Sequence, residues 1–189
     1  MPKPESKSLS APQELLRLHD TIRSCKNCGL HATRTQAVPG VGPCPANVMI
    51  VGEAPGFNED RQGEPFVGAA GKLLDTLLAR IALSRLDVYI TNVLKCRPPM
   101  NRDPMPNEAE ACSPYLSISR LHGSLVMQGE IAYVPLYHPA AALHNGSLVA
   151  DLEHDFDRVK KYLDRFLAPP PPPEPVPVPT QEAEQLNLL

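Results

Sequence analysis

The chain has 189 residues, among them 23 prolines, five cysteines and no tryptophan. This length suits one domain with an appendage, and no apolar stretch approaches the ~18 residues of a membrane-spanning helix. Residues 1–10 lack the apolar segment of a signal peptide, so we expect a cytoplasmic protein, in which an odd number of cysteines argues against a disulfide framework. The net charge of −3 argues against strong affinity for nucleic acid, until its distribution along the chain is considered.

Helices and strands alternate along the predicted domain. Apolar residues at helical spacing predict helices at 12–24, 69–83 and 147–167. Short apolar or β-branched runs predict strands at 47–51, 87–93 and 131–136. The alternation indicates an α/β fold with three αβα layers around a mostly parallel sheet, in which ligands bind at the carboxyl ends of the strands.

Chemically suggestive segments follow each predicted strand. They cover residues 52–56, 91–102 and 137–142. Residues 52–56 and 63–71 are rich in small residues, which let a ligand approach the backbone closely. A dinucleotide site is excluded, because no G-x-G-x-x-G opens a helix directly after a strand. His138 ends the last strand, where a histidine by itself is more often structural than catalytic.

A proline-rich run divides the chain. Residues 168–180 hold eight prolines, which form an extended polyproline II spacer of ~3.1 Å per residue. We therefore predict a domain at 1–167, a linker at 168–180 and a tail at 181–189. Linker and tail carry three glutamates and no basic residue, so the domain itself is neutral. Residues 72–102 hold six Lys or Arg against two Asp, a net charge of +4, and the initial argument against DNA binding does not hold.

Four of the five cysteines have the spacing of a metal site. Cys25 and Cys28 form a C-x2-C pair, and Cys96 and Cys112 form a later pair. Thiolates at such spacings bind either tetrahedral zinc or an iron–sulfur cluster, and the spacing does not separate the two. Unrelated buried thiols are the alternative. Cys44, flanked by prolines, has no partner at ligand spacing and is interpreted as a loop thiol.

Taken together and in this order, six segments resemble the iron–sulfur, or type 4, uracil-DNA glycosylases. They are C-x2-C-x-L at 25–30, V-G-E-A-P-G at 51–56, G-E-P-F-V-G-A-A-G at 63–71, I-T-N-V-L-K-C-R-P-P-x-N-R at 90–102, E-A-C-x-P-Y-L at 110–116 and Y-H-P-A-A-A-L at 137–143. The resemblance implies a DNA-repair enzyme that flips uracil out of DNA and hydrolyses its glycosidic bond. The product is an abasic site, the start of base excision repair.

The resemblance also implies a four-stranded parallel sheet, of which one interior strand is missing here. Leu116 and Ile118 are almost adjacent, where the family continues into a further strand and helix. Loss of an interior strand breaks two hydrogen-bond ladders. We therefore expect severe destabilisation, or a re-paired sheet in which the strand at 131–136 moves beside the strand at 47–51.

The family's cofactor and catalytic groups fall on residues of this chain. The resemblance implies a [4Fe–4S] cluster on the two cysteine pairs. It gives His138 the role of donor to the uracil 2-carbonyl, where the charge of the leaving group collects. Glu53 would orient the attacking water or stabilise the cation-like sugar. The alternative for Glu53 is a solvated turn residue.

The resemblance further implies a pocket for the extruded base and a surface for DNA. Phe66 is the expected stacking platform, Asn92 the group that distinguishes uracil from cytosine, and backbone amides near Gly52 would assist. Phosphate contacts are expected from the basic residues Lys95, Arg97, Arg102 and Arg120, each of which could instead be a solvated charge. Probing of the duplex is expected from the loop at Leu143 and His144.

The chain ends in a peptide that resembles the sliding-clamp-binding motif of bacterial replication and repair proteins. Its residues are Gln185, Leu186, Leu188 and Leu189. The expected partners are thus uracil-containing DNA and a sliding clamp, bound by a monomer associated with the nucleoid. Two readings compete with the enzyme: a catalytically impaired, clamp-tethered DNA-binding module with a structural cluster, and a zinc-stabilised adaptor. For the tail, the alternative is a disordered segment with incidental leucines.

Overall fold

The computed structural model describes residues 10–115, 126–128, 131–134 and 136–167. Its α-helices are α1 (Ala11–Ser24), α2 (Phe57–Gln62), α3 (Ala69–Arg80), α4 (Pro106–Cys112), α5 (Pro139–His144) and α6 (Leu148–Phe166). Its strands are β1 (Met49–Gly52), β2 (Tyr89–Asn92), β3 (Val126–Gln128) and β4 (Ile131–Tyr133). Three short 3-10 helices are η1 (Gly29–Ala32), η2 (Pro99–Asn101) and η3 (Ser113–Tyr115).

The helices begin where local sequence favours a helix start. Ser10 caps α1, and its backbone N–H donates to Gln13 Oε1 at 3.0 Å. Proline stands in the first turn of α1, α4 and α5, where its missing N–H costs nothing. The three predicted helices are confirmed as α1, α3 and α6, with ends within a few residues of the expected ones.

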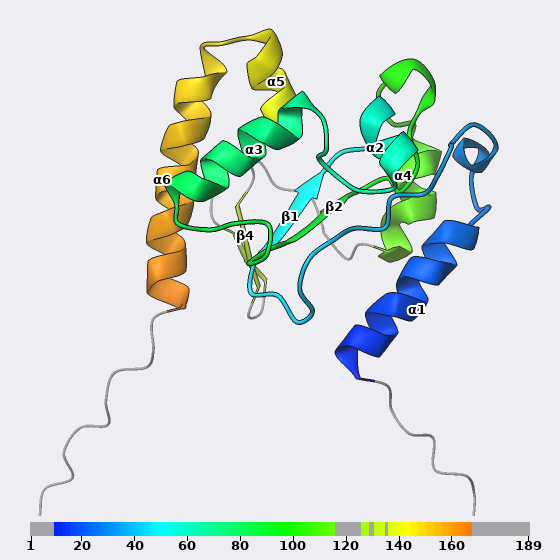
Figure 1. Cartoon of the computed structure of the whole chain (residues 1–189), viewed down its shortest axis with the longest axis horizontal. Coiled ribbons are helices and arrows are strands. Elements are labelled where there is room, and N and C mark those ends of the chain that lie inside the picture. The colour runs from blue at the N-terminus through cyan, green and yellow to red at the C-terminus, as the bar shows by residue number, and fades with distance from the viewer. Residues whose placement is uncertain (1–9, 116–125, 129–130, 135, 168–189) are drawn as a thin grey trace, which may run out of the picture.

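The α/β class is confirmed by a small parallel sheet with helices beside it. β1 pairs with β2 in a parallel register that runs from Met49 opposite Tyr89 to Gly52 opposite Asn92. α3, α5 and α6 pack against one another on one side of this pair, and α1, α2 and α4 lie on the other side (Figure 1). The buried core on the α3 side consists of Phe66, Leu74, Leu77, Leu78, Ile81, Val88, Ile90, Ala142, Leu152 and Phe156.

The third predicted strand is present but pairs differently from our expectation. β4 lies inside the predicted range 131–136, yet it forms an antiparallel pair with β3. The hypothesis that this strand moves beside β1 is therefore wrong. Among the described residues, the parallel sheet consists of β1 and β2, and Val41 bridges the other edge of β2 through two backbone hydrogen bonds with Ile90.

The described chain ends within one residue of the predicted domain boundary. α6 ends at Phe166, and the linker at 168–180 and the tail at 181–189 lie outside the described residues. The division into domain, linker and tail stays a prediction. In the described part of the chain, no helix is long and apolar enough to cross a membrane.

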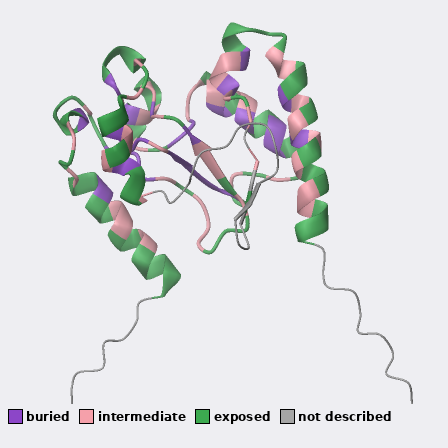
Figure 2. Ribbon diagram, turned by 180° about the vertical axis from the view of Figure 1, so that it is seen from behind, coloured by how far each residue is buried: buried purple, intermediate pink, exposed green. Residues whose placement is uncertain are grey.

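The two ends of the described chain lie on the same edge of the molecule. β1 points toward the edge where α2 and α5 lie, whereas α1 begins and α6 ends at the opposite edge (Figure 1). Seen from behind, the same two helix ends again point to the lower edge, on opposite sides of the molecule (Figure 2). The buried residues concentrate between them and the upper edge, where the polar segments after β1 and β2 meet.

Candidate active site and cysteine centre

The site begins where β1 and β2 end. Gly52 and Asn92 are the last residues of the two strands and are partners in the parallel register. A Cβ atom on Gly52 would clash with Asn92 Oδ1 and would lie 2.7 Å from Phe66 Cζ. Gly52 therefore packs directly against both Asn92 and Phe66, the other two residues that the sequence predicts for uracil binding, because it has no side chain. Asn92 is only 2% exposed, as a specific base-recognition group requires.

Phe66 is held in a conformation that few side chains adopt. Its φ is +54°, in the left-handed region, and its ring is buried. Glu59 Oε1 accepts hydrogen bonds from the backbone N–H groups of Val67 and Gly68, both at 2.9 Å. The carboxylate thereby fixes the backbone directly after the ring. Its position seven residues before Phe66 gave no signal of this role in the sequence.

Arg85 holds the same loop from the other side. Its guanidinium donates to the carbonyl oxygens of Pro65 at 3.2 Å and Phe66 at 2.5 Å, and its Nε donates to Asp75 Oδ1 at 2.6 Å. Gly71 leaves the space for this arrangement, since a Cβ there would collide with the Phe66 carbonyl. The sequence shows Arg85 only as one more basic residue, so its role in the loop was missed.

His138 lies against Phe66 at the start of α5. The two ring centroids are 5.4 Å apart, with the planes tilted by 31°. His138 Nδ1 accepts a hydrogen bond from the backbone N–H of Ala140 at 3.1 Å, so the neutral ring carries its proton on Nε2. Burial lowers the pKa of His138, and the nearby Glu59 carboxylate partly opposes this. The imidazole is therefore a neutral Nε2–H donor at pH 7, and its predicted role toward the uracil 2-carbonyl stays a prediction.

Glu53 follows β1 directly at the same edge of the sheet. Its backbone carbonyl accepts from the N–H of Leu94 at 2.9 Å, and the Gly52 carbonyl accepts from Val93 at 2.8 Å. These two bonds extend the β1–β2 pairing by one step and fix the backbone of Glu53. The residue is exposed, so its carboxylate is accessible to water, and its catalytic role stays a prediction.

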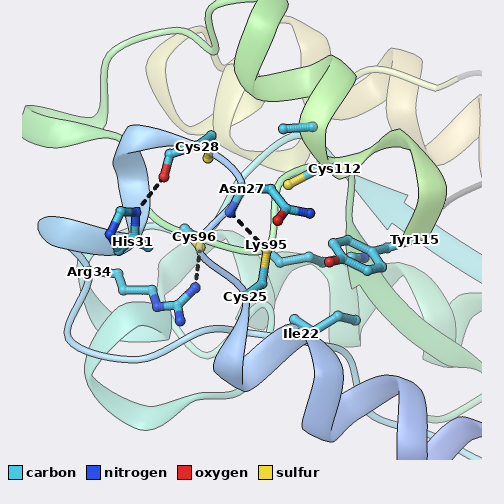
Figure 3. Close-up of a pocket in the computed structure, with 11 residues that line it drawn as sticks. Ile22, Cys25, Asn27, Cys28, His31, Arg34, Lys95, Cys96, Cys112 and Tyr115 are labelled. Carbon is cyan, nitrogen blue, oxygen red and sulfur yellow. Dashed lines mark hydrogen bonds between the residues drawn. The ribbon is translucent and has the colours of Figure 1, made fainter.

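The four predicted cysteine ligands line one cavity (Figure 3). Cys25 and Cys28 come from the turn after α1, Cys96 from the segment after β2, and Cys112 from the end of α4. Elements far apart in the sequence thus deliver four thiols to one place. Cys44 does not line this cavity, and its interpretation as a loop thiol stays a prediction.

Hydrogen-bond donors surround the thiols. Arg34 Nη1 donates to Cys96 Sγ at 2.9 Å, and the backbone N–H of Asn27 approaches Cys25 Sγ at 3.5 Å. Tyr115 hydrogen-bonds with Cys25, and this bond, together with burial, raises the pKa of the Tyr115 hydroxyl to about 12. Burial raises the pKa values of the Cys96 and Cys112 thiols, so bound cations are needed to keep them as thiolates at neutral pH.

The spacing of the thiols bears on the kind of metal group. Sulfurs on one zinc ion lie about 4 Å apart, since each Zn–S bond is about 2.3 Å. Among the described residues, no three His, Cys, Asp or Glu side chains group as ligands of a single metal ion. Four thiols line the cavity together with the imidazole of His31, and such donors suit either a zinc ion or an iron–sulfur cluster.

One predicted DNA contact is wrong. Lys95 is 3% exposed, and its Nζ donates to Thr91 Oγ1 at 2.7 Å and to the Asn92 carbonyl at 2.6 Å. Burial lowers the pKa of Lys95 to about 8, partly offset by the neighbouring Cys112. The ammonium therefore cannot reach a phosphate. It lies between the cysteine cavity and the strand end that carries Asn92.

The side chains of the other predicted DNA contacts differ in exposure and in how far they are already paired with other residues. Arg102 is paired with Glu108 through contacts of 2.6 and 2.9 Å, so most of its guanidinium is already engaged. Arg97 is half-buried and donates to Asn101 Oδ1 at 2.7 Å. Leu143, 51% exposed, and His144 lie at the end of α5. Outside the described residues lie Arg120 and the clamp-peptide residues Gln185, Leu186, Leu188 and Leu189.

Comparisons with known proteins give a consistent family. The sequence profile of the Uracil DNA glycosylase superfamily matches residues 39–166. A "Type-4 uracil-DNA glycosylase" from Archaeoglobus fulgidus is 44% identical, over 73% of this chain and 87% of its own length. Proteins of the same name from Sulfurisphaera tokodaii and Pyrobaculum aerophilum are 42% and 41% identical. Their matches cover 78% and 82% of this chain, and 84% and 98% of those proteins.

The same alignments include more positions than the matched residues of this chain. The match to the Archaeoglobus fulgidus protein runs over 174 positions, but 73% of 189 residues is about 138, which leaves about 36 positions unmatched. The Pyrobaculum aerophilum match runs over 193 positions against about 155 residues, which leaves about 38. A strand–helix unit takes about 30 residues or more. The unmatched positions are together about as many as a strand and helix would take, the kind of unit that the resemblance predicts to be missing between Leu116 and Ile118.

Proposed function

Since the chain belongs to the uracil DNA glycosylase superfamily and, within it, to the type-4 uracil-DNA glycosylases, we propose that it removes uracil from DNA by hydrolysis. The reaction breaks the N-glycosidic bond and leaves an abasic site, which base excision repair then processes. The observation that carries the proposal is the close approach of Gly52 to both Phe66 and Asn92 at one strand edge, with His138 beside Phe66.

Recognition requires the uracil to leave the base stack. An extruded base would stack on Phe66, whose ring is fixed by the bonds of Glu59 and Arg85 to its loop. Asn92 would offer its amide N–H₂ to the uracil 4-carbonyl and its carbonyl to the ring N3–H. Cytosine carries an amino group and an unprotonated nitrogen at those places, so it would leave both ends of a buried amide unsatisfied.

Cleavage produces an anionic base and a cation-like sugar. As the bond between N1 and C1′ breaks, its electron pair passes to the uracil ring, and the negative charge collects on the 2-carbonyl oxygen. The His138 Nε2–H would donate to that oxygen, which needs the neutral imidazole that burial favours. The Glu53 carboxylate would stabilise the sugar and orient a water molecule, whose oxygen bonds to C1′ as its proton passes to the carboxylate.

The four cysteines would hold a [4Fe–4S] cluster. Such a cluster supplies covalent cross-links between distant segments of a chain. Here Cys25 and Cys28 would be tied to Cys96 and Cys112, which fixes the segment after β2 and, through Lys95, the carbonyl of Asn92. The support comes from the four thiols that line one cavity and their N–H donors, and the name type 4 agrees with it.

Release of free uracil from a single-stranded oligonucleotide that contains one uracil tests the function. We expect release by the purified, cluster-loaded protein, and a large loss of rate in Glu53→Gln and His138→Ala variants that still bind the oligonucleotide. No release by a folded, brown protein with visible cluster absorption would contradict the enzyme and favour the non-catalytic module. A colourless protein that contains zinc would favour the adaptor.

The remaining contacts are proposals of finer detail. Arg97, Arg102 and Arg120 would contact phosphates, and Leu143 with His144 would probe the duplex. The peptide Gln185–Leu189 would bind a sliding clamp, which raises the local concentration of the enzyme near new DNA. Binding to a purified clamp should be lost in the Leu186→Ala/Leu188→Ala double variant, and unchanged binding would contradict this part.

A further inference from the structure

An exposed aromatic ring lies next to the candidate active site, under two guanidinium groups. Phe57 is the first residue of α2 and follows the 52–56 segment directly, yet it is 51% exposed. The Cζ atoms of Arg97 and Arg61 lie 5.1 and 5.6 Å from the centroid of its ring. An exposed ring with cations beside it is the combination that binds nucleotides, because a base stacks on the ring and its phosphate pairs with the cations.

The charge of this surface is positive, although α2 also contains two acidic residues. Both carboxylates are used inside the protein. Glu59 binds the backbone after Phe66, and Asp60, only 4% exposed, accepts from the N–H of Thr35 at 2.9 Å. Arg61 is thus the exposed charged side chain of the helix, next to the uncharged Phe57, Asn58 and Gln62, and its charge is complementary to a phosphate.

The neighbouring loop extends the surface in the same direction. η2 holds Met100 and Asn101 at φ values of +57° and +55°, and Met100 is 91% exposed. Asn101 Oδ1 accepts from Arg97 Nε at 2.7 Å, which holds that guanidinium in its place beside Phe57. α2 and this loop lie on one side of the upper edge of the molecule, and α5, with the exposed Leu143, lies on the other (Figure 1).

We propose that Phe57, Arg61 and Arg97 form a subsite for a nucleotide adjacent to the extruded uridine, with its base stacked on Phe57 and its phosphate between the two guanidinium groups. The proposal rests on the proposed function, since it places uridine against Phe66. DNA would then be held from both sides of the site, by this subsite and by the end of α5. The subsite contributes to affinity and does not touch the bond that breaks.

The chain offers a matched control. Phe166, 46% exposed at the end of α6, has the guanidinium of Arg165 6.0 Å from its ring. It is an exposed phenyl with a cation beside it, but at the edge opposite the site (Figure 1). Phe166→Ala therefore removes an equivalent surface pair without touching the proposed subsite.

Binding is measured on a single-stranded oligonucleotide with 2′-fluoro-2′-deoxyuridine, which resists cleavage, and with 2-aminopurine placed on either side of it. We expect Phe57→Ala to weaken binding by about five-fold or more, Phe57→Trp to preserve it, and Phe166→Ala to leave it unchanged. The 2-aminopurine on one side should be quenched in the native complex and recover its fluorescence in Phe57→Ala. The plot of log affinity against log salt concentration should become less steep in Arg61→Gln and in Arg97→Gln. Arg165→Gln should leave this slope unchanged.

Uracil release is then measured for the same variants at saturating oligonucleotide. An unchanged kcat with a raised KM in Phe57→Ala supports the subsite. Equal affinity of the Phe57 and Phe166 variants, or 2-aminopurine fluorescence that does not depend on Phe57, overturns it. If the Phe57→Ala variant does not fold, the proposal is tested by the oligonucleotide affinity of Phe57→Leu and by the 2-aminopurine fluorescence of the native complex. Absence of uracil release by the native protein contradicts the proposed function instead, and the binding results still stand.

Discussion

Because glycine has no side chain, Gly52 leaves Asn92 and Phe66 the space they occupy at the proposed base pocket. The contacts with Asn92 and Phe66 described above leave no room for even a methyl group. The positions of Asn92 and Phe66 thus depend on the absence of one Cβ atom at Gly52. A substitution that adds this atom should lower the rate of the reaction strongly and change the stability of the fold little.

Gly52→Ala should lower uracil release by about 100-fold, because the added Cβ displaces Phe66 or Asn92 from the base. Single-turnover release measures the effect. The matched control is Gly146→Ala, where a Cβ would meet nothing within 4 Å. Equal rates in the two variants would contradict the contact at Gly52.

The pH dependence of the reaction should follow His138. Its pKa lies below the ordinary value of 6.5, so the neutral donor is lost, and kcat falls, only as the pH drops below 6.5 through that lowered pKa. Glu59→Gln removes a charge that raises the pKa of His138 but keeps an oxygen for the bonds to Val67 and Gly68. The acid limb should therefore move to lower pH. Glu64→Gln, an exposed change in the same loop, should leave it in place, and a limb that moves to higher pH in Glu59→Gln would contradict this assignment.

At the scale of elements, local patterns were predictable and pairings were not. The spacing of apolar residues in α3 and α6 reports burial on one face, which is a property of each segment alone. The pairing of β4 with β3 depends on which other strands the chain forms, so it could not be predicted from the residues of β4 alone.

The prediction that Lys95 contacts DNA was wrong for a related reason. A lysine is normally exposed, and only the packed cavity beside Cys96 buries this one.

The loop that carries Phe66 should lose stability and function together when Arg85 is removed. Arg85→Ala leaves the carbonyls of Pro65 and Phe66 and the carboxylate of Asp75 without their donor, which should cost about 1–3 kcal/mol in free energy of unfolding. Denaturant unfolding gives that value. Added guanidinium ion should restore part of the uracil release, which a general loss of stability would not allow. Arg158→Ala, on the exposed side of α6, is the control and should change neither quantity.

For the molecule as a whole, the cysteine cavity joins segments 87 positions apart, from Cys25 to Cys112. A cross-link across such a length removes loop entropy from the unfolded chain, an effect on the order of 4 kcal/mol. If the proposed cluster forms on these cysteines, this contribution would be a large share of the stability of a typical domain. The six segments contain the four cysteines that line one cavity, and their role as ligands stays a prediction, while the contacts of Arg34 and Tyr115 with these thiols depend on tertiary packing.

Cys96→Ser should therefore abolish the visible absorption and sharply lower the unfolding temperature, whereas Cys44→Ser should change neither. Absorption spectra and thermal unfolding under anaerobic conditions measure both. Retention of full stability after removal of the metal by a chelator would contradict a structural role for the cluster.

The places where α1 begins and α6 ends have a practical consequence. Helix α1 begins and α6 ends at the edge away from the strand ends that carry Gly52 and Asn92 (Figure 1). An affinity tag, a fused fluorescent protein or a solid support attached beyond either helix would leave the opposite edge facing outward. Attachment at the start of α1 or the end of α6 therefore suits capture on a sensor surface, with the edge that carries Gly52 and Asn92 facing the sample.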